Sequence, residues 1–301
     1  MRADSVPAVR ATSLKLGGRS FDITDRALVM GILNRTPDSF YDKGATFALE
    51  DLIRRAEKLV HDGADLLDVG GVKAGPGPAV DEAVELDRVI PAIEALRSRF
   101  DIPLSVDTWR ASVAAEAYAA GAVVGNDISG FADPDYLSAA AAAGATVVAT
   151  HIRLGPRIPD PEPVYADVVA AVVDHLLERA AWAGAAGLAS DQIVLDAGLY
   201  LGKTAEQSLV LLRASDRISC LGHPLLLSAS NKPFLGAVLG LEIGERDEAS
   251  LAATALGAAL GCRIMRVHDV AAHRQVCEIL AAVNAARHGA RARVGAMIRW
   301  G

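Results

Sequence analysis

The feature that most constrains the fold is a regular alternation of short apolar runs with longer amphipathic segments. Eight such runs occur, at Leu28–Leu33, Leu66–Val69, Pro103–Val106, Ala122–Gly125, Thr146–Ala149, Ile193–Leu195, Leu225–Leu227 and Arg263–Val267. Runs this short and this apolar are typical of strands buried on both faces of a parallel sheet. Strands that alternate with helices predict an α/β fold, and eight units predict closure into a (β/α)8 TIM barrel over about residues 27–287. An open doubly wound sheet is the weaker alternative.

The segments between the runs have helical periodicity. From Leu49 to Val60, apolar residues recur at spacings of three and four, and Gly63 follows as a helix terminator. Residues 80–100 and 165–184 show the same period. Before the first run, the Gly17-Gly18 pair separates two short apolar stretches and predicts a small β-hairpin over residues 14–24. We expect one domain over residues 1–301, with a basic tail at 288–301.

Composition narrows the class of protein. Of the 301 residues 51% are hydrophobic, and the mean hydropathy is +0.27, but the longest apolar runs are too short to span a membrane. A net charge of −7 disfavours a nucleic-acid surface. The first ten residues lack the apolar core of a secretory signal, so we expect a cytoplasmic protein. Cys220, Cys262 and Cys277 form no C-x-x-C pair, which disfavours a zinc site or a disulfide framework.

Polar residues at the ends of the apolar runs predict where a ligand binds. They are Asn34, Asp68, Asp107, Asn126-Asp127, His151, Asp196, Ser230 and His268-Asp269. In a barrel these residues converge at the carboxyl-end face, where binding and catalytic groups lie. A single Asp or Asn here is best explained as a cap or turn residue, but eight such positions exceed that need.

These polar groups suit a polar heterocycle that carries a phosphate. Arg266 and His268 are two residues apart and share one strand face, where the Arg fork could bind phosphate oxygens. Asn34 opens a Thr36-Pro37-Asp38 loop and could bind a phosphate-associated Mg²⁺. The simpler interpretation is that carboxylates and cations neutralise one another in the barrel mouth.

Three further residue types fit the heterocycle itself. Asp107 and Asp196 could accept from the N–H groups of a guanidine-like ring edge, and Asn126 offers both a donor and an acceptor. Lys232, just beyond the seventh run, could reach the same ring.

Several motifs resemble those of dihydropteroate synthases. Met30-Gly31-Ile32-Leu33-Asn34-Arg35-Thr36-Pro37-Asp38-Ser39-Phe40 is similar to the first family signature, except at Arg35. Asp68-Val69-Gly70-Gly71, Val106-Asp107-Thr108, Asn126-Asp127-Ile128-Ser129-Gly130, Gly202-Lys203-Thr204 and Arg266-Val267-His268-Asp269-Val270 follow in family order. The resemblance covers about residues 27–270.

The resemblance implies a reaction, a cofactor and an assembly. The family joins p-aminobenzoate to a hydroxymethyl-dihydropterin pyrophosphate and displaces pyrophosphate with Mg²⁺ present. By analogy, the pterin pocket would be lined by Asp107, Asn126, Asp196 and Lys232, and the pyrophosphate site by Asn34, Arg266 and His268, with Asn34 also at the metal. The resemblance further implies a homodimer that packs through later barrel helices, for which 252–260 and 276–283 supply apolar candidates.

Departures from the family pattern concentrate in the loops. Where the family has Glu-Ser-Thr-Arg-Pro-Gly, a loop on the p-aminobenzoate side, this chain has Val72-Lys73-Ala74-Gly75-Pro76-Gly77. Tyr200 and Ser228 stand where the family has glycine, Leu201 replaces an aromatic residue, and Asn231 replaces a cation. Because misplacing a reactant removes much of a rate enhancement, these changes predict weak or absent synthase activity with the pterin side retained. A working dihydropteroate synthase and a pterin-dependent methyltransferase barrel remain as alternatives.

Overall fold

The computed structural model describes residues 10–36 and 48–287 and contains a closed barrel of eight parallel strands. Around the ring the order is β10-β3-β4-β5-β6-β7-β8-β9, so each strand lies next to its neighbours in sequence. The strands are β3 (Leu28–Asn34), β4 (Leu66–Gly70), β5 (Leu104–Asp107), β6 (Val124–Asp127), β7 (Thr146–Thr150), β8 (Ile193–Asp196), β9 (Leu225–Leu227) and β10 (Ile264–Val267). The predicted TIM barrel is confirmed, and the open-sheet alternative is wrong.

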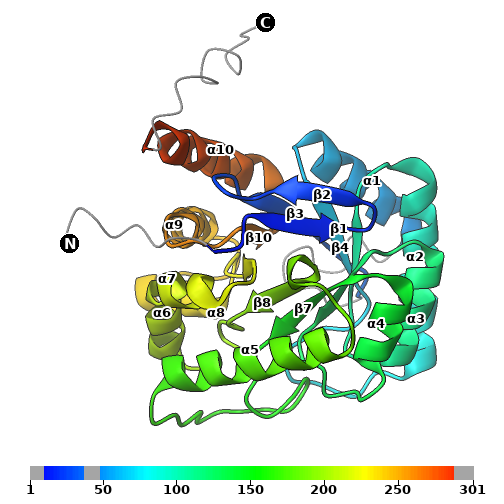
Figure 1. Cartoon of the computed structure of the whole chain (residues 1–301), viewed down its shortest axis with the longest axis horizontal. Coiled ribbons are helices and arrows are strands. Elements are labelled where there is room, and N and C mark those ends of the chain that lie inside the picture. The colour runs from blue at the N-terminus through cyan, green and yellow to red at the C-terminus, as the bar shows by residue number, and fades with distance from the viewer. Residues whose placement is uncertain (1–9, 37–47, 288–301) are drawn as a thin grey trace, which may run out of the picture.

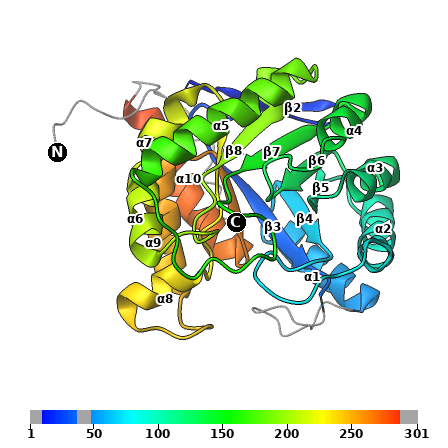
Figure 2. The same ribbon diagram turned by 90° about the horizontal axis from the view of Figure 1, so that it is seen from below.

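Helices surround the strands (Figures 1 and 2). They are α1 (Leu49–His61), α2 (Glu82–Arg99), α3 (Ala111–Ala120), α4 (Tyr136–Ala143), α5 (Val168–Ala185), α6 (Ala205–Arg213), α7 (Ser215–Ile218), α8 (Pro233–Leu239), α9 (Asp247–Ala259) and α10 (Val270–Arg287), with short 3-10 turns at Ser190–Gln192 and Ser219–Leu221. Their ends follow ordinary local rules. Thr204 and Gln207 form a reciprocal capping box at the start of α6. Gly121 and Gly144 end α3 and α4 at positive φ.

Two apolar clusters form the core. One lies between the strands and the helices and includes outward-facing residues such as Val69, Val106 and Leu195. The other fills the barrel interior at its amino end, where Met30, Leu66 and other inward-facing residues meet the N-terminal hairpin. The period-two alternation of strand side chains separates these two clusters. The same alternation places polar residues inside the barrel further along the strands.

The N-terminal hairpin plugs the amino end of the barrel. β1 (Ser13–Leu16) pairs with antiparallel β2 (Arg19–Asp22), close to the predicted 14–24. Leu14 and Leu16 are buried, and the Thr146 hydroxyl donates to the Lys15 carbonyl. The plug leaves the carboxyl end as the face that can admit a ligand. The predicted basic tail, 288–301, lies outside the described residues.

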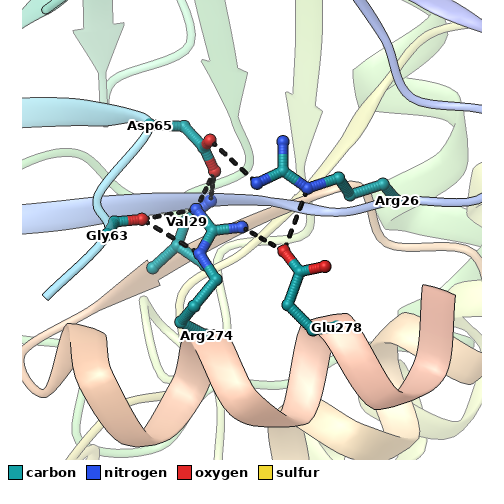
Figure 3. A network of polar contacts seen from close by, with 6 residues as sticks. All are labelled: Arg26, Val29, Gly63, Asp65, Arg274 and Glu278. Atoms are coloured by element: carbon teal, nitrogen blue, oxygen red, sulfur yellow. Dashed lines mark hydrogen bonds and ion pairs between the residues drawn. The ribbon is translucent and has the colours of Figure 1, made fainter. Parts of the chain in front are cut away.

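A charged network fastens α10 to the barrel's amino end (Figure 3). Asp65 accepts from the Val29 backbone N–H at 2.8 Å, from the Arg274 guanidinium of α10, and pairs with Arg26 at 3.4 Å. Glu278, one turn after Arg274, bonds both arginines, at 3.1 and 3.2 Å. The network therefore connects β3, the loop before β4 and the last helix, where the ring closes.

Candidate functional site

Four polar side chains from four strands form one network inside the carboxyl end of the barrel. Arg266 of β10 donates from Nε to Asp68 Oδ2 at 2.6 Å and from Nη2 to Asp107 Oδ2 at 2.7 Å. Asn126 Nδ2 donates to the same Asp68 oxygen at 3.1 Å. The four come from β4, β5, β6 and β10 and are brought together only by closure of the sheet. A guanidinium held between two carboxylates is a preorganised polar floor for a ligand.

Asp68 was among the predicted strand-end residues, but the sequence-based assignment gave it no role in binding the pterin or the pyrophosphate. Its side chain is completely buried, and its Oδ1 has no hydrogen-bond partner among the described residues. A buried carboxylate oxygen without a partner is costly and calls for a donor from outside the protein. The sequence did contain a signal, because Asp68 lies two residues before the strand end and therefore shares the inward face with Gly70.

Burial governs the charge state of this network. Desolvation raises the pKa of Asp107 to about 7, opposed by Arg266 and reinforced by Asp68. Burial disfavours the charged Arg266, yet the Asp68 and Asp107 carboxylates prevail and raise its pKa. Arg266 therefore stays charged, while Asp107 can gain or lose a proton near neutral pH.

Asp196 and Lys232 supply a second charged pair on the opposite arc of the ring. Asp196 Oδ1 accepts from the Gly198 backbone N–H at 2.8 Å, and Lys232 Nζ donates to the Leu199 carbonyl at 2.7 Å. Burial raises the pKa of Asp196 and lowers that of Lys232 to about 8, and each opposes the shift of the other. Lys232 thus remains mostly protonated at neutral pH.

Lys203 supports the loop that carries this second pair. It is nearly fully buried, and its Nζ donates to the carbonyls of His151, Gly198 and Leu201 at 2.8–3.1 Å. Burial lowers its pKa to about 7. Lys203 therefore joins the end of β7 to the β8–α6 loop.

The predicted anion-binding residues occupy neighbouring strands. Asn34 ends β3, which pairs with β10, and the Arg55 guanidinium of α1 donates to the His268 carbonyl at 2.5 Å. The Ser230 hydroxyl accepts from the His268 backbone N–H at 3.2 Å and lies 3.0 Å from its Nδ1. This contact orients the imidazole. The predicted Pro37 and Asp38 of the first loop lie outside the described residues.

Two of the predicted strand-end residues do not belong to the mouth. Asp127 accepts from the backbone N–H groups of Ser129 and Phe131, and so shapes the loop after β6. The His151 ring packs edge-on against His175 of α5, with ring centroids 4.8 Å apart. Both side chains follow an inward-facing residue and turn toward the helices, so the expected convergence of all eight positions was too broad.

The departures from the family pattern have definite places. Tyr200 and Asn231 adopt positive φ values of 67° and 58°, a backbone region that glycine enters more easily. Ser228 is buried. Arg35 donates to the carbonyls of Asp87 and Arg88 in α2. The Arg88 side chain in turn donates to the Gly71 carbonyl, at 2.9 Å, in the loop that follows β4.

The described residues contain no preformed metal site of the acidic or histidine type. Within 10–36 and 48–287, no group of three His, Cys, Asp or Glu side chains is placed to hold a metal ion. The Asp68 and Asp107 carboxylates inside the barrel mouth already bond Arg266.

No helix within residues 10–36 and 48–287 is long and apolar enough to cross a membrane.

The geometry agrees with comparisons to known proteins. The "Pterin binding enzyme" family model matches residues 30–268, and the chain belongs to this family. Within it, the chain is similar to the Mycobacterium leprae protein named "Inactive dihydropteroate synthase 2", at 46% identity over 87% of this chain and 92% of that protein. It is 40% identical to the dihydropteroate synthase of Synechocystis, over 88% of this chain and 93% of that enzyme.

A solved structure gives the same result for the fold. The Yersinia pestis dihydropteroate synthase, determined with a sulfonamide drug, superposes with a TM-score of 0.87 at 36% identity and covers 91% of this chain and 99% of that one. The resemblance found in the motifs is therefore confirmed. The methyltransferase alternative gains no support from these relatives.

Proposed function

We propose that this protein binds a pterin carrying a pyrophosphate, or a closely related phosphorylated ligand, and has little or no dihydropteroate synthase activity. The observation that carries the proposal is the network of Asp68, Asp107, Asn126 and Arg266. It places acceptors for ring N–H groups beside a cation for phosphate oxygens, at the one end of the barrel that the hairpin does not plug.

The pterin would occupy the side of the mouth lined by Asp107, Asn126, Asp196 and Lys232. A carboxylate acceptor on either side suits the amidine-like edge of a pterin, since that edge presents several N–H donors. Lys232 would contact a ring carbonyl or nitrogen. In the absence of ligand, Asp107 accepts from the Arg266 Nη2. When a pterin N–H donates to Asp107 instead, the Arg266 Nη2 would be released to donate to the phosphate oxygens.

The pyrophosphate would lie toward β3 and β10, against Asn34, Arg266 and His268. Arg supplies a planar fork for phosphate, and a histidine Nε2 adds one more donor. With no preformed metal cluster among the described residues, Mg²⁺ would arrive on the pyrophosphate, with the Asn34 amide oxygen as its protein ligand. We therefore expect Mg²⁺ binding in titrations that contain pyrophosphate and none with Mg²⁺ alone.

Loss of synthase activity is supported by two independent facts. The β4–α2 loop lacks the Glu, hydroxyl and Arg side chains that the family pattern places on the p-aminobenzoate side. Among the relatives above, the higher identity is to the protein named inactive. Chemistry needs both reactants in near-attack geometry, whereas binding one reactant needs only its own half of the site.

The experiment measures binding and turnover separately. Calorimetric titration with the pterin pyrophosphate should give saturable binding that Arg266→Ala weakens. Pyrophosphate release with both substrates at saturation should stay near background. Robust release would reject the proposal in favour of a working synthase, which the 40% identity to the Synechocystis enzyme makes the second candidate.

A restored variant locates the defect. Val72→Glu, Lys73→Ser, Ala74→Thr and Gly75→Arg should recover some turnover, and more with Ser228→Gly and Tyr200→Gly added. A restored protein that binds both substrates and remains inert would move the defect to Leu201 or Asn231.

We also propose that the protein is a cytoplasmic homodimer and that residues 1–301 form one domain. α9 and α10 pack against each other, and they expose Leu256, Ile279 and Val283 at 41%, 68% and 45%. Exposed apolar side chains on adjacent helices favour self-association. Light scattering should give twice the mass of one chain, and Ile279→Glu should shift it toward the monomer. A wild-type monomer at micromolar concentration would reject the dimer.

A further inference from the structure

The β4–α2 loop is held by arginines from three different parts of the chain. Guanidinium groups donate to five of its backbone carbonyls, which are Gly71 (from Arg88), Lys73, Gly75 and Pro78 (all from Arg157) and Val80 (from Arg110), at distances of 2.5–2.9 Å. Carbonyls in a loop without ladder partners need donors from elsewhere, and charged donors make the stronger bonds. The five bonds therefore hold the backbone of this loop in one conformation.

Arg157 accounts for the central part of this arrangement. Its Nη1 donates to Lys73 O and Gly75 O at 2.8 and 2.9 Å, and its Nη2 to Pro78 O at 2.6 Å. A Cβ on Gly77 would lie 2.5 Å from Nη2, so a larger residue at this position would force the guanidinium to shift. Gly77 thus lets the turn lie close against the Arg157 guanidinium.

The Arg157 contact bridges distant parts of the barrel mouth. Arg157 lies in the β7–α5 loop, and two strands, β5 and β6, separate β7 from β4 in the ring. Those two strands end at Asp107 and Asp127 and carry Asn126. In Figure 2 the β7–α5 loop runs in front of the barrel strands. The two loops therefore meet across the side of the mouth that carries Asp107 and Asn126.

The bridging loop is itself fastened at other points. Arg153 pairs with Asp160 within the loop. Nearer α5, the Tyr165 hydroxyl donates to the Gly202 carbonyl at 2.7 Å. Arg157 thus reaches the β4–α2 loop from a segment that is anchored to the β8–α6 loop, on the far side of β7.

We propose that Arg157 is a specificity-determining residue, which fixes the β4–α2 loop as a permanent wall and restricts the mouth to a single phosphorylated heterocycle. The guanidinium donates to three of the chain's own carbonyls, so those N–H groups are not available to the carboxylate of an aryl amine. The loop is closed before any ligand arrives, so p-aminobenzoate has no half-site to enter. This inference rests on the proposed function only for the identity of the ligand that is admitted.

We call the three bonds from Arg157 to the β4–α2 loop the Arg157 clamp. The first test measures how firmly this clamp holds the loop when no ligand is present. Lys73 is the loop's own lysine, so an endoprotease that cleaves after lysine cuts Lys73–Ala74 only when the loop opens. Arg157→Ala should speed this cleavage at least about tenfold, because losing bonds to a charged donor shifts an equilibrium by that factor or more. Arg157→Lys should lie between Arg157→Ala and wild type. Arg19→Ala, which removes an exposed ion pair with Asp101 at the amino end of the barrel, should match wild type.

Cleavage of Arg157→Ala at the wild-type rate would overturn the proposal that Arg157 holds the loop closed.

The second test titrates p-aminobenzoate into protein saturated with pyrophosphate and Mg²⁺. Wild type should show no binding, and Arg157→Ala should show weak binding, while its affinity for the pterin pyrophosphate stays within about twofold, well under the tenfold step of 1.4 kcal/mol. Binding of p-aminobenzoate by wild type would overturn the single-ligand mouth. If Arg157→Ala speeds cleavage as expected but the protein binds no pterin pyrophosphate, the proposed function is rejected and the role of Arg157 in holding the loop stands.

Discussion

Removing the positive charge of Arg266 should destabilise the protein in a pH-dependent way. Arg266 contacts Asp68 at 2.6 Å and Asp107 at 2.7 Å, and Asp68 is completely buried. In Arg266→Met, Asp68 keeps only the Asn126 amide as a hydrogen-bond donor among the described residues. Leaving a buried carboxylate without its ion-pair partner costs about 3–5 kcal/mol. We therefore expect the free energy of unfolding at pH 8 to fall by roughly that amount.

The sign of the pH dependence follows from the Asp107 pKa. It is about 7 even with Arg266 present, well above the value of 3.8 for a free Asp, and losing the cation raises it further. A carboxyl whose folded-state pKa is raised lowers stability as the pH rises from its unfolded to its folded pKa. The Asp107 contribution to the penalty is therefore present at alkaline pH and disappears at pH 5, where Asp107 is protonated.

Urea unfolding at pH 8 and pH 5 measures both effects, and an unchanged slope with denaturant would show that the denatured state is unaltered. Arg19→Ala is the matched control, because Arg19 pairs with Asp101 in solvent and should contribute at most about 1 kcal/mol. A loss below about 1 kcal/mol in Arg266→Met at pH 8 would refute the buried-pair reasoning. An equal loss at pH 5 and pH 8 would refute the assignment to carboxylate charge.

Three further outcomes are expected. Ligand affinity should peak between pH 7 and 8, because Asp107 must be ionised (pKa about 7) and Lys232 protonated (pKa about 8), and Asp107→Asn should flatten the acid side of a calorimetric pH series. Asp65→Ala should lower the unfolding free energy by about 2–4 kcal/mol, since it removes the acceptor of the Arg274 guanidinium and of a backbone N–H, whereas a loss below about 1 kcal/mol in urea would show that the network in Figure 3 is dispensable. Tyr200→Gly should be more stable than Tyr200→Ala by about 1 kcal/mol in thermal unfolding, because residue 200 has φ 67°; the reverse order would contradict backbone strain there.

The barrel and most of its ligand face could be predicted from local patterns in the sequence. Short apolar runs fix strands buried on both faces, and the period-two alternation fixes which side chains point inward, so Asp107, Asn126, Asp196 and Arg266 could be assigned to the mouth from their positions at strand ends. The hairpin followed from the Gly17-Gly18 turn in the same way. The strands, their inward-facing residues and the hairpin turn all depend on residues close together in the sequence, so a local sequence pattern predicts them.

Which of these groups are in contact could be learned only from the folded barrel. Asp68 and Arg266 are 198 residues apart, and only barrel closure puts a fully buried carboxylate against the guanidinium. No periodicity in the sequence predicts the bonds from Arg157 to the 73–78 turn, because these bonds depend on how two loops fold over the barrel mouth. Asp127 and His151 were assigned to the mouth because they end strands, but a one-residue shift in a strand reverses the direction of a side chain. Contacts between distant loops and the exact residue at which a strand ends depend on packing, and a single sequence does not encode them as a pattern.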